Sequence, residues 1–451
     1  MKKLLKKNAC VVSLIVLFCG VSFAQNTQQI YSSSTAISYM LPLTARVSTN
    51  GADIISTMVV TDGSEFIKID PSNPAQSRRF TSDSIIDVED MVVFDNYVYF
   101  CGVIDSIYGV WGFFKESEFG TNQVNVSYVQ LPYTNNNVIA KKIRAYKDND
   151  GQTMVVVLAN EYNHSTSTPL IYRNNLYIGT INGGNFLYNV FFTSTFNQGG
   201  NNNADKIQDI ALTDNYIVTA GVESHSSQEI RLIRIKKANT SIADCRKISD
   251  PTPIAVNGPI VIESLKNDDV AFSALFTDVA NNKNYARLYT FNMANFTNLT
   301  IQDVELGEKS DPDNLLYLPD DESLLLTLTD YNCPSFGDVS GVIFYLDPYA
   351  TSMYTADFLY DLNQRFYSFD RFTGSLFLAG GRKLGSERMY LIRDKQAGAI
   401  SNCYHYSSKR VIIRHTLSVQ ECPVSINSGL LPVDLLQYTP KDYNLYNGCI
   451  E

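Results

Sequence analysis

Short apolar runs bounded by polar turns recur along the chain, and they form a repeat. The nine residues "DNYVYFCGV" (Asp95–Val103) return as "DNYIVTAGV" (Asp214–Val222), 119 positions later. The stretch Ala220–Ile235 matches Ala379–Asp394 in its Ala-Gly start and its Leu-Ile-Arg segment, at an offset of 159. These offsets are about two and three times a unit of 53 to 60 residues, which indicates an array of similar units.

Weaker copies of the pattern fill the rest of the chain. Each copy is an apolar run, then a polar loop, then a second run rich in Val, Ile, Tyr and Phe. This composition is typical of β-strands and turns, and no sustained helical periodicity follows the first 24 residues. The seven runs begin near Ile54, Val98, Met154, Ile217, Val270, Leu324 and Leu376.

Antiparallel repeats whose strands are apolar on both faces predict an all-β fold, and we interpret it as a single β-propeller of seven blades. Neighbouring blades sandwich each central strand, which explains runs such as "VYFCG" and "VVVLA". Gly102, Gly221 and Gly380 end such strands, where a tight bend or a close backbone approach is expected. Six or eight blades stay open as alternatives. A parallel β-helix would need shorter repeats, and a string of sandwich domains would need linkers.

The segments outside the repeats predict how the ring closes. Residues Ile30–Val47 precede the first repeat, and Arg410–Val419 and Leu430–Tyr438 follow the last one. A blade that takes strands from both ends of the chain locks the ring and removes free sheet edges. We therefore predict closure by strands from both termini.

The stretches "DNYVYFCGV…GVWGFF" and "GSLFLAGG…MYLIR" resemble the β-propeller repeats of secreted bacterial proteins (SBBP-like repeats). Those repeats pair a [DN]-x-[YV]-V-x-x-G strand with an aromatic- or Leu-rich strand about eleven residues later, and both stretches here show a similar arrangement of a glycine-ended strand and a second apolar strand. The resemblance implies the propeller fold. It leaves the activity open, because such repeats serve in binding, adhesion, assembly and catalysis.

The first 24 residues have the composition of an export signal. Lys2, Lys3, Lys6 and Lys7 precede an apolar core at Ala9–Val21, and small residues occupy the cleavage positions at Ser22 and Ala24. We expect a signal peptide at residues 1–24, a propeller domain at residues 25–451, and export to the periplasm, the outer surface or the medium. A lipoprotein anchored at Cys19 is disfavoured because the bulky Phe18 precedes it.

The charge of the chain argues against some partners. Removing a signal that carries four lysines and no acid changes the net charge from −10 to about −14. An acidic protein repels phosphate backbones and anionic headgroups, so we expect neither nucleic acid nor a membrane surface as partner. No apolar run after the signal has the length of a membrane span.

Six cysteines remain after the signal, which permits disulfides in an exported chain. Cys403 and Cys422 are close in sequence and flank a strand-like run, and we predict that they form a disulfide. Cys245 and Cys403 occupy equivalent places in units three blades apart, so a bond between them is excluded by distance. Cys101 lies inside an apolar strand, where a buried free thiol is expected.

Recognisable catalytic chemistry is missing from the sequence. There is no G-x-S-x-G elbow, H-E-x-x-H helix, complete calcium loop or Cys/His cluster, so no catalytic residue, metal site or cofactor is predicted. Two functions stay open. The favoured one is a non-catalytic binding or scaffold propeller that recognises a protein or carbohydrate on one face. The alternative is a secreted carbohydrate-active hydrolase or lyase with carboxylates on inner strands around the axis.

An acid recurs where each central strand meets its following loop, and a basic pair takes its place in the seventh repeat. Equivalent positions of a propeller lie on one face, so these residues would form a ring that receives a cationic or hydroxyl-rich partner. Turn chemistry alone also explains most carboxylates at strand ends. The residues are Asp62, Asp105, Glu161, Glu223, Asp278, Asp330, Arg382 and Lys383.

Overall fold

Almost every regular element of the chain is a β-strand. In the part of the chain that the structure describes, the one helical segment is the short 3-10 helix η2 (Glu116–Gly120). The computed structural model describes residues 29–33, 43–60, 63–70, 73, 77–83, 86–105, 107–132, 137–163, 170–193, 206–222, 229–249, 254–278, 283–306, 310–330, 340–362, 364–371, 376–383, 387–394, 405–414, 417–422, 424–443 and 445–447.

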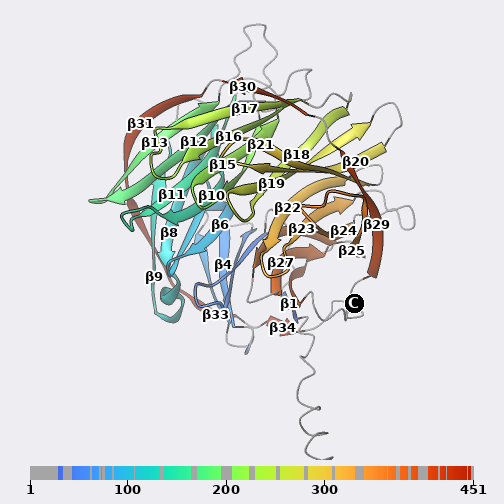
Figure 1. Cartoon of the computed structure of the whole chain (residues 1–451). Helices are drawn as coiled ribbons and strands as arrows, with labels where there is room; N and C mark the ends of the chain where they lie inside the picture. Colours follow the sequence, from blue (N-terminus) through green and yellow to red (C-terminus); the bar gives the residue numbers. More distant parts are fainter. Residues whose placement is uncertain are drawn as a thin grey trace, which may run out of the picture.

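The strands pair into antiparallel meanders, called units 1 to 7 here, and the fold is the all-β propeller that the sequence predicts (Figure 1). Within units 1 to 6 four strands follow one another in chain order. Units 1 to 3 consist of β2 (Leu43–Val47), β3 (Ile54–Val60), β4 (Gly63–Ile69) and β5 (Ser77–Asp83); β6 (Ile86–Phe94), β7 (Tyr97–Ile104), β8 (Tyr108–Lys115) and β9 (Val124–Gln130); and β10 (Asn137–Lys147), β11 (Thr153–Asn163), β12 (Leu170–Asn182) and β13 (Asn185–Thr193).

The remaining units continue the same plan. Unit 4 consists of β14 (Lys206–Leu212), β15 (Tyr216–Val222), β16 (Glu229–Lys236) and β17 (Ala243–Ser249). Units 5 and 6 consist of β18 (Ile254–Ser264), β19 (Asp269–Asp278), β20 (Lys283–Asn292) and β21 (Thr297–Glu305); and β22 (Ser310–Leu318), β23 (Ser323–Asp330), β24 (Ser340–Leu346) and β25 (Tyr354–Leu362). Unit 7 begins with β26 (Gln364–Arg371), β27 (Leu376–Lys383) and β28 (Glu387–Asp394).

The second strand of unit 2 is apolar on both faces because a neighbouring unit covers each face. In β7, Val98 and Phe100 pack into one cluster with Phe66 of unit 1. The alternate residues Tyr99 and Cys101 pack into another cluster with residues of unit 3. Since successive side chains of a strand point to opposite faces, one continuous apolar run fills two interfaces between units.

Two local features suit the sequence of the motif "DNYVYFCG" in unit 2. Asp95 and Asn96 both have positive φ, at 53° and 65°, which suits the two-residue turn between β6 and β7. A Cβ on Gly102 would lie 1.9 Å from the carbonyl oxygen of Asp87, so only glycine fits there. The predicted close backbone approach at Gly102 is therefore confirmed.

Closure by strands from both termini is confirmed in unit 7. The N-terminal strand β1 (Gln29–Ser33) pairs with β28, and the C-terminal strand β34 (Leu445–Asn447) pairs with the other edge of β1. Of the segments that we expected to close the ring, Ile30–Val47 begins within β1, whereas Arg410–Val419 and Leu430–Tyr438 belong to strands that pair with other units.

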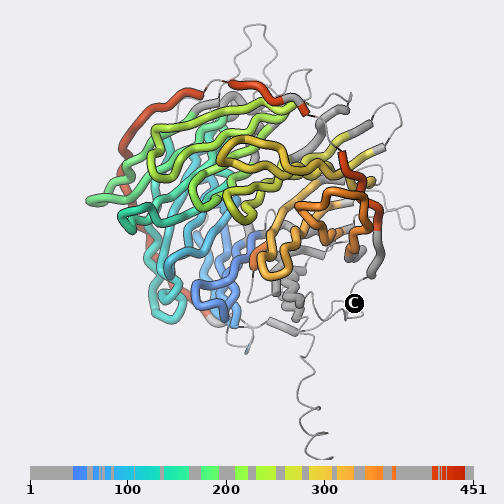
Figure 2. The backbone as a smooth tube through the Cα atoms, in the orientation of Figure 1, coloured from blue at the N-terminus to red at the C-terminus, as the bar shows by residue number. Residues whose placement is uncertain are grey.

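Residues 405–447 form a C-terminal belt that runs around the periphery of the propeller. Figure 1 shows it passing from β29 over β30 to β31 and then down to β33 and β34, and the red tube in Figure 2 follows much of this path. The belt adds an outer strand to every unit, and β29 joins units 5 and 6 by pairing with both β21 and β25. Its strands are β29 (His405–Arg414), β30 (Ser418–Cys422), β31 (Ser425–Pro432), β32 (Asp434–Tyr438), β33 (Lys441–Tyr443) and β34.

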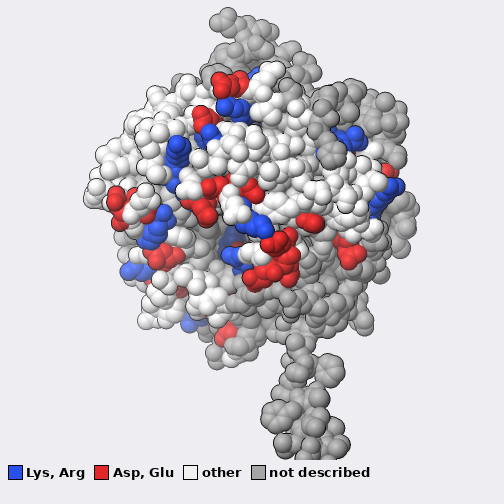
Figure 3. Space-filling model, in the orientation of Figure 1, with Lys and Arg blue, Asp and Glu red and all other residues white. Residues whose placement is uncertain are grey.

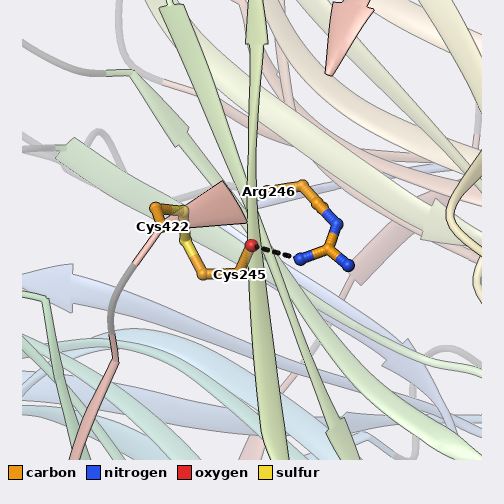
Figure 4. The surroundings of a disulfide bond; sticks show 3 residues. All are labelled: Cys245, Arg246 and Cys422. Atoms are coloured by element: carbon orange, nitrogen blue, oxygen red, sulfur yellow. Dashed lines mark hydrogen bonds between the residues drawn. A yellow bond between two sulfur atoms is a disulfide. The ribbon is translucent and has the colours of Figure 1, made fainter. Parts of the chain in front are cut away.

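The disulfide predicted between Cys403 and Cys422 is wrong. Cys422 of the belt is bonded to Cys245 of unit 4, with their Cα atoms 5.0 Å apart (Figure 4). The two residues face each other in the register between β17 and β30, whereas Cys403 lies outside the described residues. Closeness in sequence misled the prediction, because the belt carries Cys422 to a strand 177 residues away. The predicted buried free thiol at Cys101 is confirmed.

The expected signal peptide at residues 1–24 lies outside the described residues and stays a prediction. Among the residues that are described, no helix combines the length and the apolar character that a membrane crossing requires.

Candidate functional site

The first strand of each unit is the innermost, because the belt occupies the opposite edge of the sheet. Six of these inner strands carry a charged side chain toward the middle of the molecule, and together we call these residues the axial cluster. In most units a β-bulge interrupts the pairing of the first and second strands, for example between Val88 and Asp90 and between Ile207 and Asp209. The axial cluster consists of Arg46, Asp90, Arg144, Asp209, Glu263 and Asp370.

A chain of ion pairs links four neighbouring inner strands of the cluster. Arg46 Nη2 lies 3.0 Å from Asp90 Oδ1, and Arg144 Nη1 lies 2.7 Å from Asp90 Oδ2. Arg144 then reaches Asp209 Oδ1 with its Nη2, at 3.2 Å. The side chain of Asp90 is only 1% exposed, so its charge needs these partners to remain buried.

Hydrogen bonds from the backbone reinforce the same contacts. The inner edge of each sheet has N–H groups without a neighbouring strand, and buried N–H groups require an acceptor. Asp90 Oδ2 accepts from Ile143 N at 3.2 Å, Asp209 Oδ2 from Ile262 N at 3.2 Å, and Asp370 Oδ2 from Val47 N at 2.7 Å. In each case the acid accepts from the first strand of the following unit, so the acids connect the units around the axis.

The carboxyl groups of the cluster differ in their pKa. Burial by itself would raise the pKa of Asp90, but the charges of Arg144, Lys142 and Arg46 lower it below its usual value. Burial raises the pKa of Glu263 to about 8; Asp209 and Asp370 add to this, while Arg144 opposes it. Burial also raises the pKa of Asp370. Asp90 is therefore ionised at neutral pH, whereas Glu263 retains its proton over much of that range.

This arrangement defines two kinds of chemistry at the axis. The arginine-paired acids Asp90 and Asp209 connect inner strands. Glu263 is a carboxyl group of raised pKa that lies within the electrostatic influence of two other acids, Asp209 and Asp370, and a carboxyl group of raised pKa beside a second acid can serve as a general acid. Among the described residues, no group of three or more His, Cys, Asp and Glu side chains is placed to hold a metal ion.

Five residues of the predicted ring lie where the second strands end. Asp278 and Asp330 are the last residues of β19 and β23, Asp105 directly follows β7 and is exposed, and Arg382 and Lys383 end β27. Glu161 differs from the expectation, because β11 continues to Asn163 and leaves Glu161 within the strand and only 3% exposed. Asp62 and Glu223 lie outside the described residues.

On the face seen in Figure 3, acidic and basic side chains lie intermixed around the centre. Ion pairs also connect exposed side chains of adjacent units. Lys147 Nζ lies 2.7 Å from Asp95 Oδ2, and Lys266 Nζ lies 2.6 Å from Glu322 Oε1. In such a pair the opposite charge offsets much of the electrostatic potential of each side chain, so neither acts over a long distance.

The axial cluster was not predicted residue by residue from the sequence. One signal for it was present: Asp90 and Asp209 are 119 positions apart, which is the offset of the "DNY" repeat itself. Arg46, Arg144 and Glu263 carry no such signal, because equivalent inner-strand positions hold different residue types in different repeats.

No family model and no curated protein sequence matches this chain. Among solved structures, the propeller of Dos1 is similar with 11% sequence identity and a TM-score of 0.41, over 78% of each chain. A prolyl oligopeptidase B from Galerina marginata, solved as its S577A mutant with a 35mer hydrolysis and macrocyclization substrate, is similar with 10% identity and a TM-score of 0.32. That match covers 78% of this chain and 56% of the other. The strand pairing itself defines a β-propeller protein.

Proposed function

We propose that this protein is an exported, non-catalytic binding or scaffold propeller that recognises a protein or carbohydrate partner on one face. The observation that carries the proposal is the chain of ion pairs through Arg46, Asp90, Arg144 and Asp209. Because these arginines neutralise the axial acids and connect the inner strands, we assign the cluster a structural role. Because the axial cluster is structural in this proposal, the partner would bind on a face of the propeller.

The face that bears the ends of the second strands is the proposed receiving surface. Loops on a rigid scaffold carry binding residues in many folds, and the strands β7, β19, β23 and β27 end on this side. Its acids favour a cationic or hydroxyl-rich partner, with Arg382 and Lys383 setting the orientation. The disulfide between Cys245 and Cys422 supports export, because disulfides persist in oxidising compartments.

One observation favours a second function, a secreted carbohydrate-active hydrolase or lyase. Glu263 has a pKa of about 8 and lies within the electrostatic influence of Asp209 and Asp370. A protonated and an ionised carboxyl group are the pair that glycoside hydrolysis uses.

Binding and hydrolysis assays on the purified chain separate the two functions. A pull-down and a glycan-binding screen should identify a partner whose binding weakens in the double variant Asp105→Lys/Glu223→Lys, most strongly at low salt. Asp434→Lys on β32 of the belt is the matched control and should bind like the wild type. Unchanged affinity in the double variant would remove the acidic ring from the proposal. Glycan cleavage that Glu263→Gln abolishes would establish the hydrolase instead.

A further inference from the structure

The belt strand β31 is the outermost strand of unit 3, and it lies on the rim of the molecule beyond β13 (Figure 1). It pairs with β13 along its whole length, from Ser425 opposite Phe192 to Pro432 opposite Asn185. Among the strands that the structure describes, none pairs with its other edge. An edge of this kind offers a row of backbone donors and acceptors to any second strand.

Most edge strands of soluble proteins avoid such pairing through charge or short length. The five-residue edge strands β30 and β32 follow this rule, with Glu421 in β30 and Asp434 in β32, whereas β29 is no edge strand because it pairs with both β21 and β25. Strands β33 and β34 have three residues each. By contrast, β31 has eight residues, and neither it nor its neighbour β13 contains a charged side chain.

Exposed apolar side chains accompany this unprotected edge. Leu430 is 57% exposed and lies directly opposite Leu187 of β13, which is itself 38% exposed. Ile426 of β31 is exposed as well. Residues opposite one another in an antiparallel pair share a face, and so do residues four apart on one strand, so these three side chains share one face of the sheet.

We propose that β31 is a dimer interface, in which it pairs antiparallel with β31 of a second copy of this chain. A strand that pairs with itself must not bring like charges opposite each other, and β31 meets this condition because it carries none. A two-fold axis through Ser428 places Leu430 of each copy opposite Ile426 of the other, with Leu187 beside them. The two sheets of unit 3 then form one continuous sheet, and the interface is isologous.

Light scattering coupled to size exclusion tests this interface on the purified chain. The wild type should have twice the molar mass of Leu430→Lys, because a charge on each copy of the edge strand prevents pairing. Ile426→Lys should give the same halved mass. The matched control is Leu435→Lys on β32, which changes an equally exposed leucine (58%) of the belt and should remain dimeric. Unchanged melting temperatures would show that the variants are folded.

Three results would overturn the proposal. The wild type could be monomeric at every concentration. It could be dimeric together with Leu430→Lys and Ile426→Lys, which would place the interface elsewhere. Finally, Leu435→Lys could dissociate as completely as Leu430→Lys, which would show a general effect of charge on the belt.

Discussion

Asp90 interacts with two arginines, accepts a backbone N–H from the next unit and has almost no exposure to solvent. Asp209, at the equivalent position of unit 4, accepts a backbone N–H in the same way but interacts with only one of these arginines. At the scale of single residues, the interior therefore depends on a few polar groups whose partners come from adjacent units. Removing one partner leaves an unpaired buried charge, which costs more than the pair itself contributes.

Asp90→Asn keeps the shape of the side chain but removes its charge. We expect the free energy of unfolding to fall by about 3 kcal/mol, because Arg46 and Arg144 then lose a buried counterion. Urea denaturation measures the change. Asp105→Asn, an exposed turn residue, is the control and should change stability by less than about 0.5 kcal/mol. Equal stability of Asp90→Asn and the wild type would show that the ion-pair chain is not structural.

Gly102 is constrained by backbone rather than by a side chain that could move aside. Gly102→Ala would place its Cβ against the Asp87 carbonyl, so we expect a loss of about 3 kcal/mol or more. Gly120→Ala is the control, since nothing lies within 4 Å of a Cβ at that position. A melting curve for Gly102→Ala that matches that of the control would contradict the described approach of β6 and β7.

Glu263 predicts a dependence of stability on pH. Its pKa rises from 4.5 to about 8 on folding, so the folded chain binds the proton more tightly than the unfolded chain. Its contribution to stability is then fully present at low pH and declines as the pH rises through this interval. Glu263→Gln lacks this decline, so its stability relative to the wild type should increase between about pH 5 and pH 8. Urea unfolding at several pH values measures the difference, and a constant difference would rule out the raised pKa.

At the scale of elements, the belt is attached differently from the strands inside the units. Most side chains of β31 and β32 are exposed, so backbone hydrogen bonds hold these strands more than apolar packing does. Specific anchors occur elsewhere in the belt: the disulfide at Cys422, the ion pair of Arg414 with Asp303, and Tyr438, whose ring stacks on Phe80 at 5.6 Å. Segments with few buried contacts open locally before the rest of a protein unfolds.

Cys422→Ser tests how the belt is held. We expect a loss of about 3 kcal/mol in stability, as for other disulfides that close long loops. Hydrogen exchange should also accelerate in β30 and β31 more than in β15. A reducing agent should reproduce both effects in the wild type and should have no further effect on the variant. Exchange in β30 that does not respond to the loss of the disulfide would mean that the belt is held by other contacts.

The units were predictable from the sequence and the belt was not, for a physical reason. Runs such as Tyr97–Val103 and Tyr216–Val222 specify strand, turn and two-sided burial within a few residues, so local pattern is sufficient. The partners of β30 and β31 lie far away in the chain, and nothing in their own pattern selects β17 or β13 among the available edges. Because local pattern does not specify distant partners, the sequence analysis assigned the wrong partner to Cys422. For the same reason it did not identify the axial cluster, whose members come from six different repeats.

At the scale of the whole molecule, three systems connect the units into a ring. Apolar clusters fill the spaces between adjacent units, the axial cluster connects inner strands, and the belt adds a strand at every outer edge. The termini meet in unit 7, where β1 lies between β28 and β34. The faces then remain for recognition, in agreement with the proposed binding role.

The path of the belt is the central claim, and disulfide mapping tests it most directly. Digestion of the purified chain under non-reducing conditions, followed by mass spectrometry, identifies the peptide bonded to Cys422. The structure predicts a peptide that contains Cys245, because β30 lies against β17 with these two residues opposite each other. Cys422 bonded to Cys403, or found as a free thiol, would contradict the placement of the belt.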